Sequence, residues 1–449
     1  MSSLHFSRRS FLKSTLAAGV APLILPGRIW SAEVKPNDRI NFGCIGIGKQ
    51  MRGLMSGFLS KPETQLVAVC DVDTTRREDG KKQVEGFYAK QSGSDFKGCT
   101  THRDFRELLG RKDIDAVVIA TPDHWHALIA IAAARAGKDI YCEKPLTETI
   151  HEAWALVGAV RENKRVFQTG SMQRSAREFR VACELVRNGV IGKVSRVTTG
   201  FGGPAKPCDL PAQELEKGLD WDLWLGPAPQ REYNEILSPR GVHNHFPQWR
   251  AYREYGGGGV TDWGAHHLDI AHWGLGMDGS GPLEITPPAD WQTAEAGVKL
   301  RYDGGVEVEH IQENGVTFFG ADGEIYVNRG KIKVTVKGVE KATSLSKENK
   351  KSLAEQLDGL EQEFLADAKV KLYASTDHKA DFLGSIKSRQ SPITHEEVGA
   401  RTVTGCHLIS LAYFHGKALK WKPATNTFAD GTGDAKWLTR EYRGEWKVA

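Results

Sequence analysis

The sequence lacks the features of a disulfide-stapled, fibrous or repeat protein. Its seven cysteines are an odd number with no CxxC pair, which does not suit a disulfide framework. The 449 residues contain no internal repeat or low-complexity tract, and 26% charged and 40% hydrophobic residues are typical of a globular protein. The chain is therefore long enough for two domains, each with its own core.

A net charge is missing from most of the chain. The formal net charge is +4, and residues 1–32 carry four basic side chains and no acidic one, so the rest of the chain holds 56 bases and 56 acids. Binding to phosphate backbones needs a basic surface. We therefore expect no nucleic-acid partner.

Long hydrophobic runs are also missing. The apolar stretch 15–26 is too short to span a bilayer comfortably, and it follows Arg8, Arg9 and Ser-Phe-Leu-Lys. Residues 1–32 resemble a bacterial twin-arginine signal, whose pathway exports folded proteins. We expect the twin-arginine translocase as a partner, no stable transmembrane span, and a location in the periplasm or at the cell exterior of a bacterium. The alternative is an uncleaved anchor or a disordered basic tail.

The pattern of apolar runs divides the chain into two domains. Over 38–168, strand-length runs rich in Val and Ile alternate with helix-length segments, which predicts a doubly wound parallel sheet of the Rossmann type. Over 169–430, strand candidates follow one another, which predicts a second, α+β domain with a large, mostly antiparallel sheet. The fold class is α/β plus α+β, and residues 431–449 form a tail.

A glycine-rich turn follows the first predicted strand. Gly46 and Gly48 form a G-x-G, but Met51 occupies the third glycine position of G-x-G-x-x-G. Such glycines let the backbone approach a pyrophosphate at a helix N-terminus. Asp71 ends the second predicted strand, where a carboxylate accepts hydrogen bonds from the adenosine ribose and repels a 2′-phosphate. We predict NAD as the cofactor in preference to NADP, although Arg76 and its neighbour lie close by.

Two further motifs carry candidate chemistry. The motif Glu143-Lys144-Pro145 ends another predicted strand, where open parallel sheets bind ligands. A run of glycines precedes Asp262 and His266, which are four residues apart and would share one helical face. A carboxylate beside an imidazole orients the ring and raises its proton affinity, which suits a general base for a sugar hydroxyl.

Taken together, these motifs resemble the Gfo/Idh/MocA oxidoreductases over residues 38–422. The resemblance implies a Rossmann domain, a functional lysine in E-K-P, a C-terminal α+β sheet domain that forms homodimers or homotetramers, and a proton-transferring D-x-x-x-H pair. The candidate catalytic residues are Lys144, Asp262 and His266. The candidate cofactor-binding residues are Gly46, Gly48, Met51, Arg52, Asp71, Thr121, Pro122, His126, Glu143 and Lys144. The candidate substrate-binding residues are Arg174, His243, His245, Arg250 and Trp263. The histidines lack the spacing of a zinc site, so we predict no metal.

The resemblance predicts an NAD-dependent oxidoreductase that acts on a hydroxyl of a sugar, polyol or glycoside. In this hypothesis His266 takes the hydroxyl proton, a hydride leaves carbon for the nicotinamide, and Lys144 steadies the developing oxyanion. Export leaves a second hypothesis open, because tightly held NAD serves many turnovers only if its hydride returns. That alternative is an NAD-dependent glycosidase that works by oxidation, elimination, water addition and reduction, as in the exported α-N-acetylgalactosaminidases of the family. A redox-inactive sugar-binding module would not need Lys144 and His266.

Overall fold

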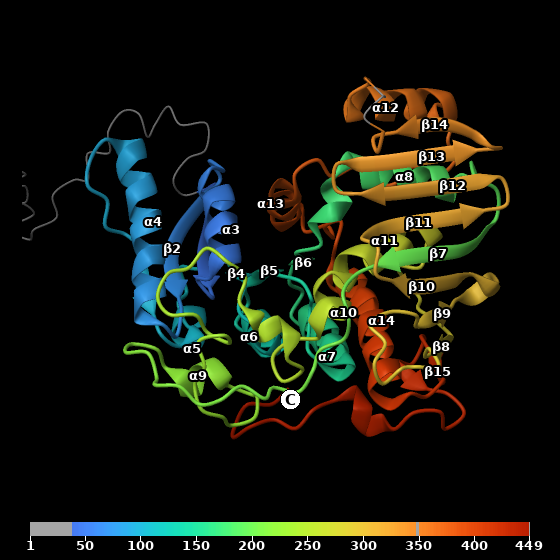
Figure 1. Ribbon diagram of the computed structural model, residues 1–449. Coiled ribbons are helices and arrows are strands. Elements are labelled where there is room, and N and C mark those ends of the chain that lie inside the picture. Colours follow the sequence, from blue (N-terminus) through green and yellow to red (C-terminus); the bar gives the residue numbers. More distant parts are fainter. Residues whose placement is uncertain (1–37, 347–349, 449) are drawn as a thin grey trace, which may run out of the picture.

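In the computed structural model, which describes residues 38–346 and 350–448, the first part of the chain forms a six-stranded parallel sheet (Figure 1). The strand order is β3-β2-β1-β4-β5-β6. The bounds are β1 Ile40–Ile45, β2 Thr64–Cys70, β3 Thr100–His102, β4 Ala116–Ile119, β5 Asp139–Cys142 and β6 Phe167–Thr169. The predicted Rossmann-like sheet is confirmed.

Helices cover both faces of this sheet, which is why its central strand β4 is apolar throughout. The helices are α3 Lys49–Leu59, α4 Thr74–Ser92, α5 Phe105–Leu109, α6 Asp123–Arg135 and α7 Ile150–Glu162. In β4, Val117 and Ile119 belong to the core beneath α6 and α7, whereas Ala116 and Val118 belong to the core beneath α3. A strand that is buried on both faces needs hydrophobic residues at successive positions.

The second part of the chain forms a ten-stranded sheet in the order β14-β13-β12-β11-β7-β10-β9-β8-β15-β16. The bounds are β7 Val194–Gly200, β8 Glu284–Thr286, β9 Lys299–Arg301, β10 Glu307–Ile311, β11 Gly315–Gly320, β12 Gly323–Asn328, β13 Lys331–Val336, β14 Val339–Thr343, β15 Leu419–Lys422 and β16 Thr427–Phe428. Only the pairing of β7 with β10 is parallel among the described strands of this sheet. The predicted mostly antiparallel sheet is confirmed.

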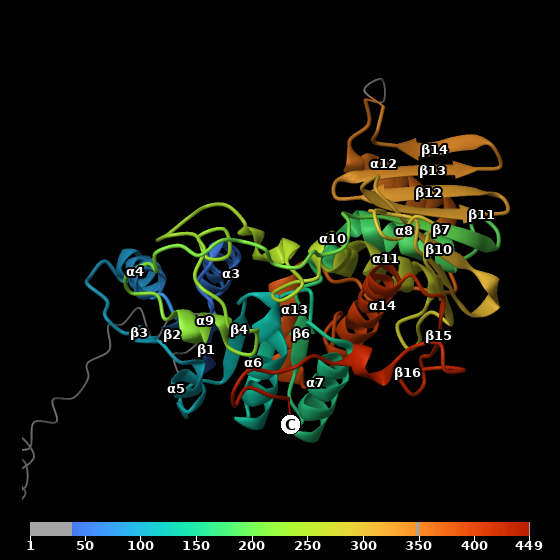
Figure 2. The same ribbon diagram turned by 60° about the horizontal axis from the view of Figure 1, so that its bottom comes forward.

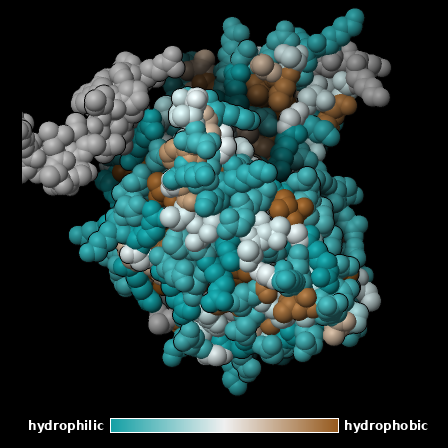
Figure 3. All heavy atoms as spheres, turned by 90° about the vertical axis from the view of Figure 1, so that its left-hand side faces the viewer, coloured by the Kyte–Doolittle hydropathy of each residue, from teal (hydrophilic) through white to brown (hydrophobic). Residues whose placement is uncertain are grey.

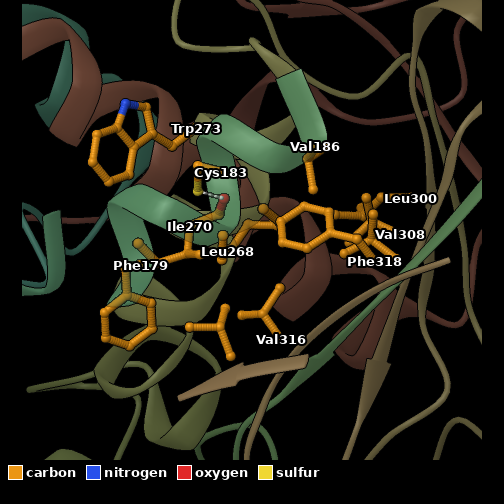
Figure 4. Close-up of a cluster of buried hydrophobic side chains, with 14 of the residues drawn as sticks. Phe179, Cys183, Val186, Leu268, Ile270, Trp273, Leu300, Val308, Val316 and Phe318 are labelled. Carbon is orange, nitrogen blue, oxygen red and sulfur yellow. Dashed lines mark hydrogen bonds between the residues drawn. The ribbon is translucent and has the colours of Figure 1, made fainter. Parts of the chain in front are cut away.

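Helices pack against this second sheet. They are α8 Arg177–Arg187, α10 Gly258–Asp262, α11 Gly264–Leu275, α12 Leu353–Leu360 and α14 Glu396–His415. Figure 4 shows Phe318 and Val316 of β11 facing Leu268 of α11 in the shared core. Gly274 permits this close packing, because a Cβ there would lie 2.5 Å from the Phe318 ring.

Three segments that follow β7 in the sequence return to the first domain. Helix α13 (His378–Ser388) buries Phe382 in the core of the parallel sheet. Residues 201–257 leave the second sheet after β7 and carry α9 (Trp221–Leu225) to the first domain (Figure 1). The C-terminal tail runs back beneath the first domain, where Trp446 packs against Trp125 (Figure 2). The last strand of the parallel sheet, β6, ends at Thr169, one residue past the predicted boundary at 168, and segments from beyond that boundary complete the first domain.

The surface on the parallel-sheet side is mainly hydrophilic, with small separate apolar spots (Figure 3). No helix in the described part of the chain is both long enough and apolar enough to cross a membrane. The predicted export signal over 1–32 lies outside the described residues.

Candidate active site

The glycine-rich turn after β1 forms one wall of a cavity at the carboxyl ends of the parallel strands. Gly46 has φ 86°, and a Cβ there would lie 2.7 Å from the backbone nitrogen of Thr121. Both facts exclude a larger residue at this position. Gly46, Gly48, Asp71, Thr121 and Pro122 all line this cavity, which we call the cofactor cavity. These five predicted cofactor residues are therefore brought together.

Asp71 lies at the end of β2, in the wall of the cofactor cavity. Its carboxylate accepts hydrogen bonds from the backbone nitrogens of Ile47 at 2.7 Å and Asp73 at 2.8 Å. Burial raises the pKa of Asp71, and the nearby Arg76 opposes that rise. Arg76 itself donates to the carbonyls of Pro239 and Gly241. A fixed carboxylate and a guanidinium already engaged by carbonyls fit the unphosphorylated ribose of NAD.

Met51 and Arg52 do not line the cofactor cavity. Met51 is fully buried in the core beneath α3, because it lies on the face of that helix that packs against the sheet. Arg52 points to the other side, where it donates to the carbonyl of His243 and to Oδ1 of Asn244 at 2.9 Å. The prediction that these two residues contact the cofactor is thus not supported by their positions.

The 201–257 segment covers the cofactor cavity. It contributes lining side chains that include Leu223, Trp224, Leu237, His243 and Phe246. It is held to the first domain by the contacts of Arg52 and Arg76 and by a backbone bridge between Asp73 and Leu219. A ligand in this cavity is therefore enclosed between the parallel sheet and the covering segment.

A second cavity, of about 190 Å³, opens beside the first. We call it the catalytic cavity, because Lys144, Asp262 and His266 all line it. Of the other predicted site residues, it is also lined by Thr121, His126, Glu143, Arg250 and Trp263. The two cavities share Gln50, Ala120, Thr121, Phe246 and Arg250 in their walls. The sequence motifs from both domains thus meet at one place.

Lys144 and Asp262 form an ion pair across the catalytic cavity. Lys144 Nζ lies 2.6 Å from Oδ1 of Asp262 and 3.0 Å from its backbone carbonyl oxygen. Burial acts to raise the pKa of Asp262, but Lys144 and then Arg250 outweigh it and hold that pKa below its usual value. The ammonium group is therefore fixed in the wall by a carboxylate that stays ionised.

His266 does not pair with Asp262 in the described structure, although the sequence spacing predicted that it would. Helix α10 ends at Asp262, and α11 begins at Gly264, so the two residues do not lie on one continuous helix. Nδ1 of His266 is buried without a hydrogen-bond partner. Burial, and then the positive charges of Lys144 and Arg329, lower the pKa of His266 well below its usual value. The ring is neutral at pH 7, which is opposite to the raised proton affinity that the motif predicted.

Three polar residues of the catalytic cavity were not predicted. They are Gln50, Asp123 and Arg329. Gln50 donates to Glu143 at 2.9 Å, and Arg329 lies 4.7 Å from the centre of the Trp263 ring. Asp123 begins α6, and its burial raises its pKa well above the usual value. Its position shortly after β4, at the carboxyl end of a parallel strand, could have predicted that Asp123 lies at the site. Arg329 lies in the turn between β12 and β13, where no sequence motif marks it.

Arg174 does not reach either cavity. It is 2% exposed and makes paired contacts with Asp269 at 2.7 and 2.9 Å and with Asp278 at 2.7 and 2.8 Å. The two carboxylates use its donors inside the second domain. The prediction that Arg174 binds substrate is therefore wrong, and its position gives it a structural role.

The two histidines predicted to bind substrate in the 242–250 segment lie in different surroundings. His243 lines the cofactor cavity rather than the catalytic one, whereas His245 is exposed and lines neither. Elsewhere, buried histidines have ordinary partners: His267 contacts the Gly200 carbonyl, and His272 contacts the Tyr302 hydroxyl. Within the described ranges, no group of three or more His, Cys, Asp or Glu residues is arranged to hold a metal ion.

Comparison with known families agrees with both sheets. Residues 40–171 match the family described as "Oxidoreductase family, NAD-binding Rossmann fold", and residues 184–448 match "Oxidoreductase family, C-terminal alpha/beta domain". The chain belongs to the Gfo/Idh/MocA oxidoreductase family. Its first domain is thus an NAD-binding Rossmann domain, as predicted.

Individual relatives are more distant. The chain is 29% identical over 205 residues to "Glycosyl hydrolase family 109 protein 2" of Shewanella sp. (strain ANA-3), which is 42% of this chain and 44% of that protein. It is 26% identical over 212 residues to an "Alpha-N-acetylgalactosaminidase" of Tannerella forsythia, 43% of this chain and 45% of that protein. The chain thus matches less than half of the length of these two relatives.

A solved structure shares the fold over most of its length. The aldose-aldose oxidoreductase of Caulobacter crescentus has a TM-score of 0.55 and 19% identity, with 85% of this chain and 99% of that chain covered. At this identity the likeness concerns the arrangement of the two sheets alone.

Proposed function

We propose that this Gfo/Idh/MocA protein oxidises a hydroxyl group of a sugar, polyol or glycoside by hydride transfer to NAD. The observation that carries the proposal is the junction of the two cavities. Thr121 and Gln50 line both, so they would hold the nicotinamide end of a bound NAD beside the cavity that contains Lys144 and His266. Open parallel sheets bind their ligands at these strand ends.

The residues of the catalytic cavity divide the remaining work. Bound NAD supplies the hydride acceptor. The neutral imidazole of His266 accepts the proton of the substrate hydroxyl, because its ring lines the cavity and its side chain makes no hydrogen bond within the described structure. The Lys144 ammonium donates to the oxygen as it becomes a carbonyl, and Asp262 keeps Lys144 in place.

A redox-neutral glycosidase is the second candidate function. It is favoured by the covering segment over the cofactor cavity, because enclosed NAD that returns its hydride needs no exchange. The relatives named as glycosyl hydrolases support the same alternative. In that cycle oxidation makes a neighbouring C–H acidic, the leaving group is eliminated, water adds, and the hydride returns to carbon.

The first test separates these functions with the untruncated protein. The protein is purified and denatured, the supernatant is assayed for NAD, and the native protein is offered nitrophenyl glycosides and free sugars with and without added NAD. Bound NAD with cleavage and no added cofactor supports the glycosidase. Dependence on added NAD with accumulation of NADH supports the dehydrogenase. A protein that neither cleaves nor oxidises any member of the panel contradicts both.

A matched variant tests whether the covering segment retains the cofactor. Arg52→Ala removes two contacts to that segment without touching the cavity wall, so we expect faster NAD dissociation and less NAD in the purified protein. Arg301→Ala, in the second sheet and exposed, is the control. Equal NAD content in both variants would show that the segment does not retain NAD.

We also propose that residues 1–32 export the folded protein by the twin-arginine route. Seven unpaired thiols, six of them buried, are compatible with folding in a reducing cytoplasm before export. Cell fractionation of the full chain and of a chain starting at Glu33 tests this. A truncated chain that still leaves the cytoplasm would contradict it.

The oligomeric state remains a proposal as well. By resemblance to its family, the chain is expected to form a homodimer or homotetramer through the second domain. Light scattering of the purified protein tests this expectation, and a monomer at micromolar concentration would contradict it.

A further inference from the structure

We propose that a groove outside the catalytic cavity binds a second carbohydrate ring, so that the substrate is a glycoside of at least two rings. This inference rests on the proposed function, because it extends the substrate of the same site. The groove has a volume of about 680 Å³, against about 190 Å³ for the catalytic cavity. Most of the open space beside the reacting groups therefore lies outside the place where a hydroxyl meets His266.

The groove is continuous with the catalytic cavity. Phe246, Arg250 and Asp262 line both. Asp262 is the partner of Lys144, so the groove begins next to the group that holds the oxidised oxygen. A ring bonded to the reacting sugar would extend along this shared wall into the groove.

The first two residues of α10, Gly258 and Gly259, form part of the groove wall. A Cβ at Gly258 would lie 2.5 Å from the backbone nitrogen of Ala205, and a Cβ at Gly259 would lie 2.4 Å from the Cα of Gly202. The two chain segments can approach this closely only without side chains. Gly258, Gly259 and Ala205 all line the groove, so this part of its wall is closely packed backbone without long side chains.

The remaining lining has the chemistry of a sugar site. Phe246 is 46% exposed, and Trp291 and Phe414 are half-buried, so their rings offer apolar surface. The side-chain amides of Gln248 and Gln292 are exposed and make no hydrogen bond in the described part of the chain. Apolar faces next to free amides match the C–H faces and hydroxyl groups of a pyranose.

The charges of the groove favour a neutral ligand. Lys206 and Arg250 are balanced by Glu295 and Asp262 in the lining.

The indole of Trp291 is held in place by the end of α14, since a Cβ at Gly416 would lie 2.2 Å from it. A ring that is already held in place loses little freedom when a sugar stacks on it.

The test compares one-ring and two-ring probes on the full-length protein. The probes are methyl galactoside with lactose, and methyl glucoside with maltose and cellobiose. Calorimetric titration gives Kd for each, and kcat/KM is measured wherever turnover occurs. We expect Trp291→Ala to weaken the two-ring probes about tenfold and the one-ring probes less than about twofold, because a tenfold change corresponds to about 1.4 kcal/mol, which is within the range of one ring contact. Gln248→Ala should act in the same direction, and Trp437→Ala, whose ring stacks on His415 outside the groove, is the control.

Two results would overturn the inference. One is a wild type that binds the two-ring probes no more tightly than the one-ring probes, including one that binds neither. The other is a Trp291→Ala variant that keeps the wild-type ratio between the two classes. Failure of the proposed function has a different signature, namely tight binding of two-ring probes with no hydride transfer to NAD and no cleavage.

Discussion

Two ion pairs that involve carboxylates of the second domain are similar in chemistry but differ in their surroundings. Lys144 with Asp262 and Arg174 with Asp269 each join a cation to a carboxylate carried by the consecutive helices α10 and α11. The side chains of the first pair are 17% and 25% exposed, whereas those of the second are 2% and 1% exposed. Lys144 and Asp262 line the catalytic cavity, whereas Arg174 and Asp269 line neither of the two cavities nor the groove.

The two pairs differ in whether the cation keeps hydrogen-bond donors that a ligand can reach. Asp269 and Asp278 together occupy the fork of Arg174, so no ligand can approach it. Lys144 gives its contacts to a single residue and still borders open space. A buried ion pair therefore indicates function only where donors remain and a ligand can reach them.

Breaking the Arg174–Asp269 pair should have the largest effect, which is a loss of stability. Arg174→Leu leaves Asp269 buried without its partner, so we expect the free energy of unfolding to fall by about 3–5 kcal/mol. Urea unfolding followed by tryptophan fluorescence measures this. Arg177→Leu removes two more exposed pairs, with Asp358 and Glu361, and should cost less than about 1 kcal/mol. A variant with normal stability and no turnover would instead place Arg174 in the reaction.

Breaking the Lys144–Asp262 pair should lower turnover. Lys144→Ala removes the donor to the developing carbonyl oxygen, so we expect kcat to fall by about 10²–10³ while urea unfolding changes little. Steady-state kinetics on the glycoside panel measures it. Lys420→Ala, an exposed lysine paired with Asp430, is the control and should keep wild-type kcat. Turnover of Lys144→Ala within a few-fold of wild type would contradict the assignment.

The role of neutral His266 as the base can be tested by changing Arg329. In the wild type the lowered pKa of His266 keeps the ring unprotonated, so kcat/KM should stay level as the pH falls from 8 to about 6.5, the pH at which an ordinary histidine is half protonated. Arg329→Leu removes one positive charge, so the pKa of His266 rises and the acid limb of the profile moves to higher pH. Lys331→Leu, on the same hairpin, should leave it in place. An acid limb in Arg329→Leu at the wild-type pH would exclude His266 as the base.

The smallest effect concerns the choice of cofactor. Asp71→Ala removes an acceptor for the ribose hydroxyls, so we expect the affinity for NAD to fall roughly tenfold, while the affinity for NADP does not fall. Fluorescence titration of protein stripped of nucleotide measures both. Asp79→Ala, farther along α4, is the control. An unchanged ratio of the two affinities would show that Asp71 does not face the ribose.

The sequence alone determined the two sheets and the centre of the site. Local patterns carry this information, because strands buried on both faces must be apolar and a close turn such as that at Gly46 must be glycine. The same holds for Lys144, since the end of a parallel strand is a place that chain order predicts.

Only the tertiary structure decided how these residues act. Sequence spacing predicted Asp262 beside His266, but the break at Trp263 and the arrival of Lys144 from the other domain set a different pair. Burial, together with Lys144 and Arg329, lowers the pKa of His266. Both cations are far from His266 in the sequence, so its neighbouring residues do not predict this shift. The cover of residues 201–257 depends in the same way on contacts between segments more than a hundred residues apart, and local sequence patterns do not encode such contacts.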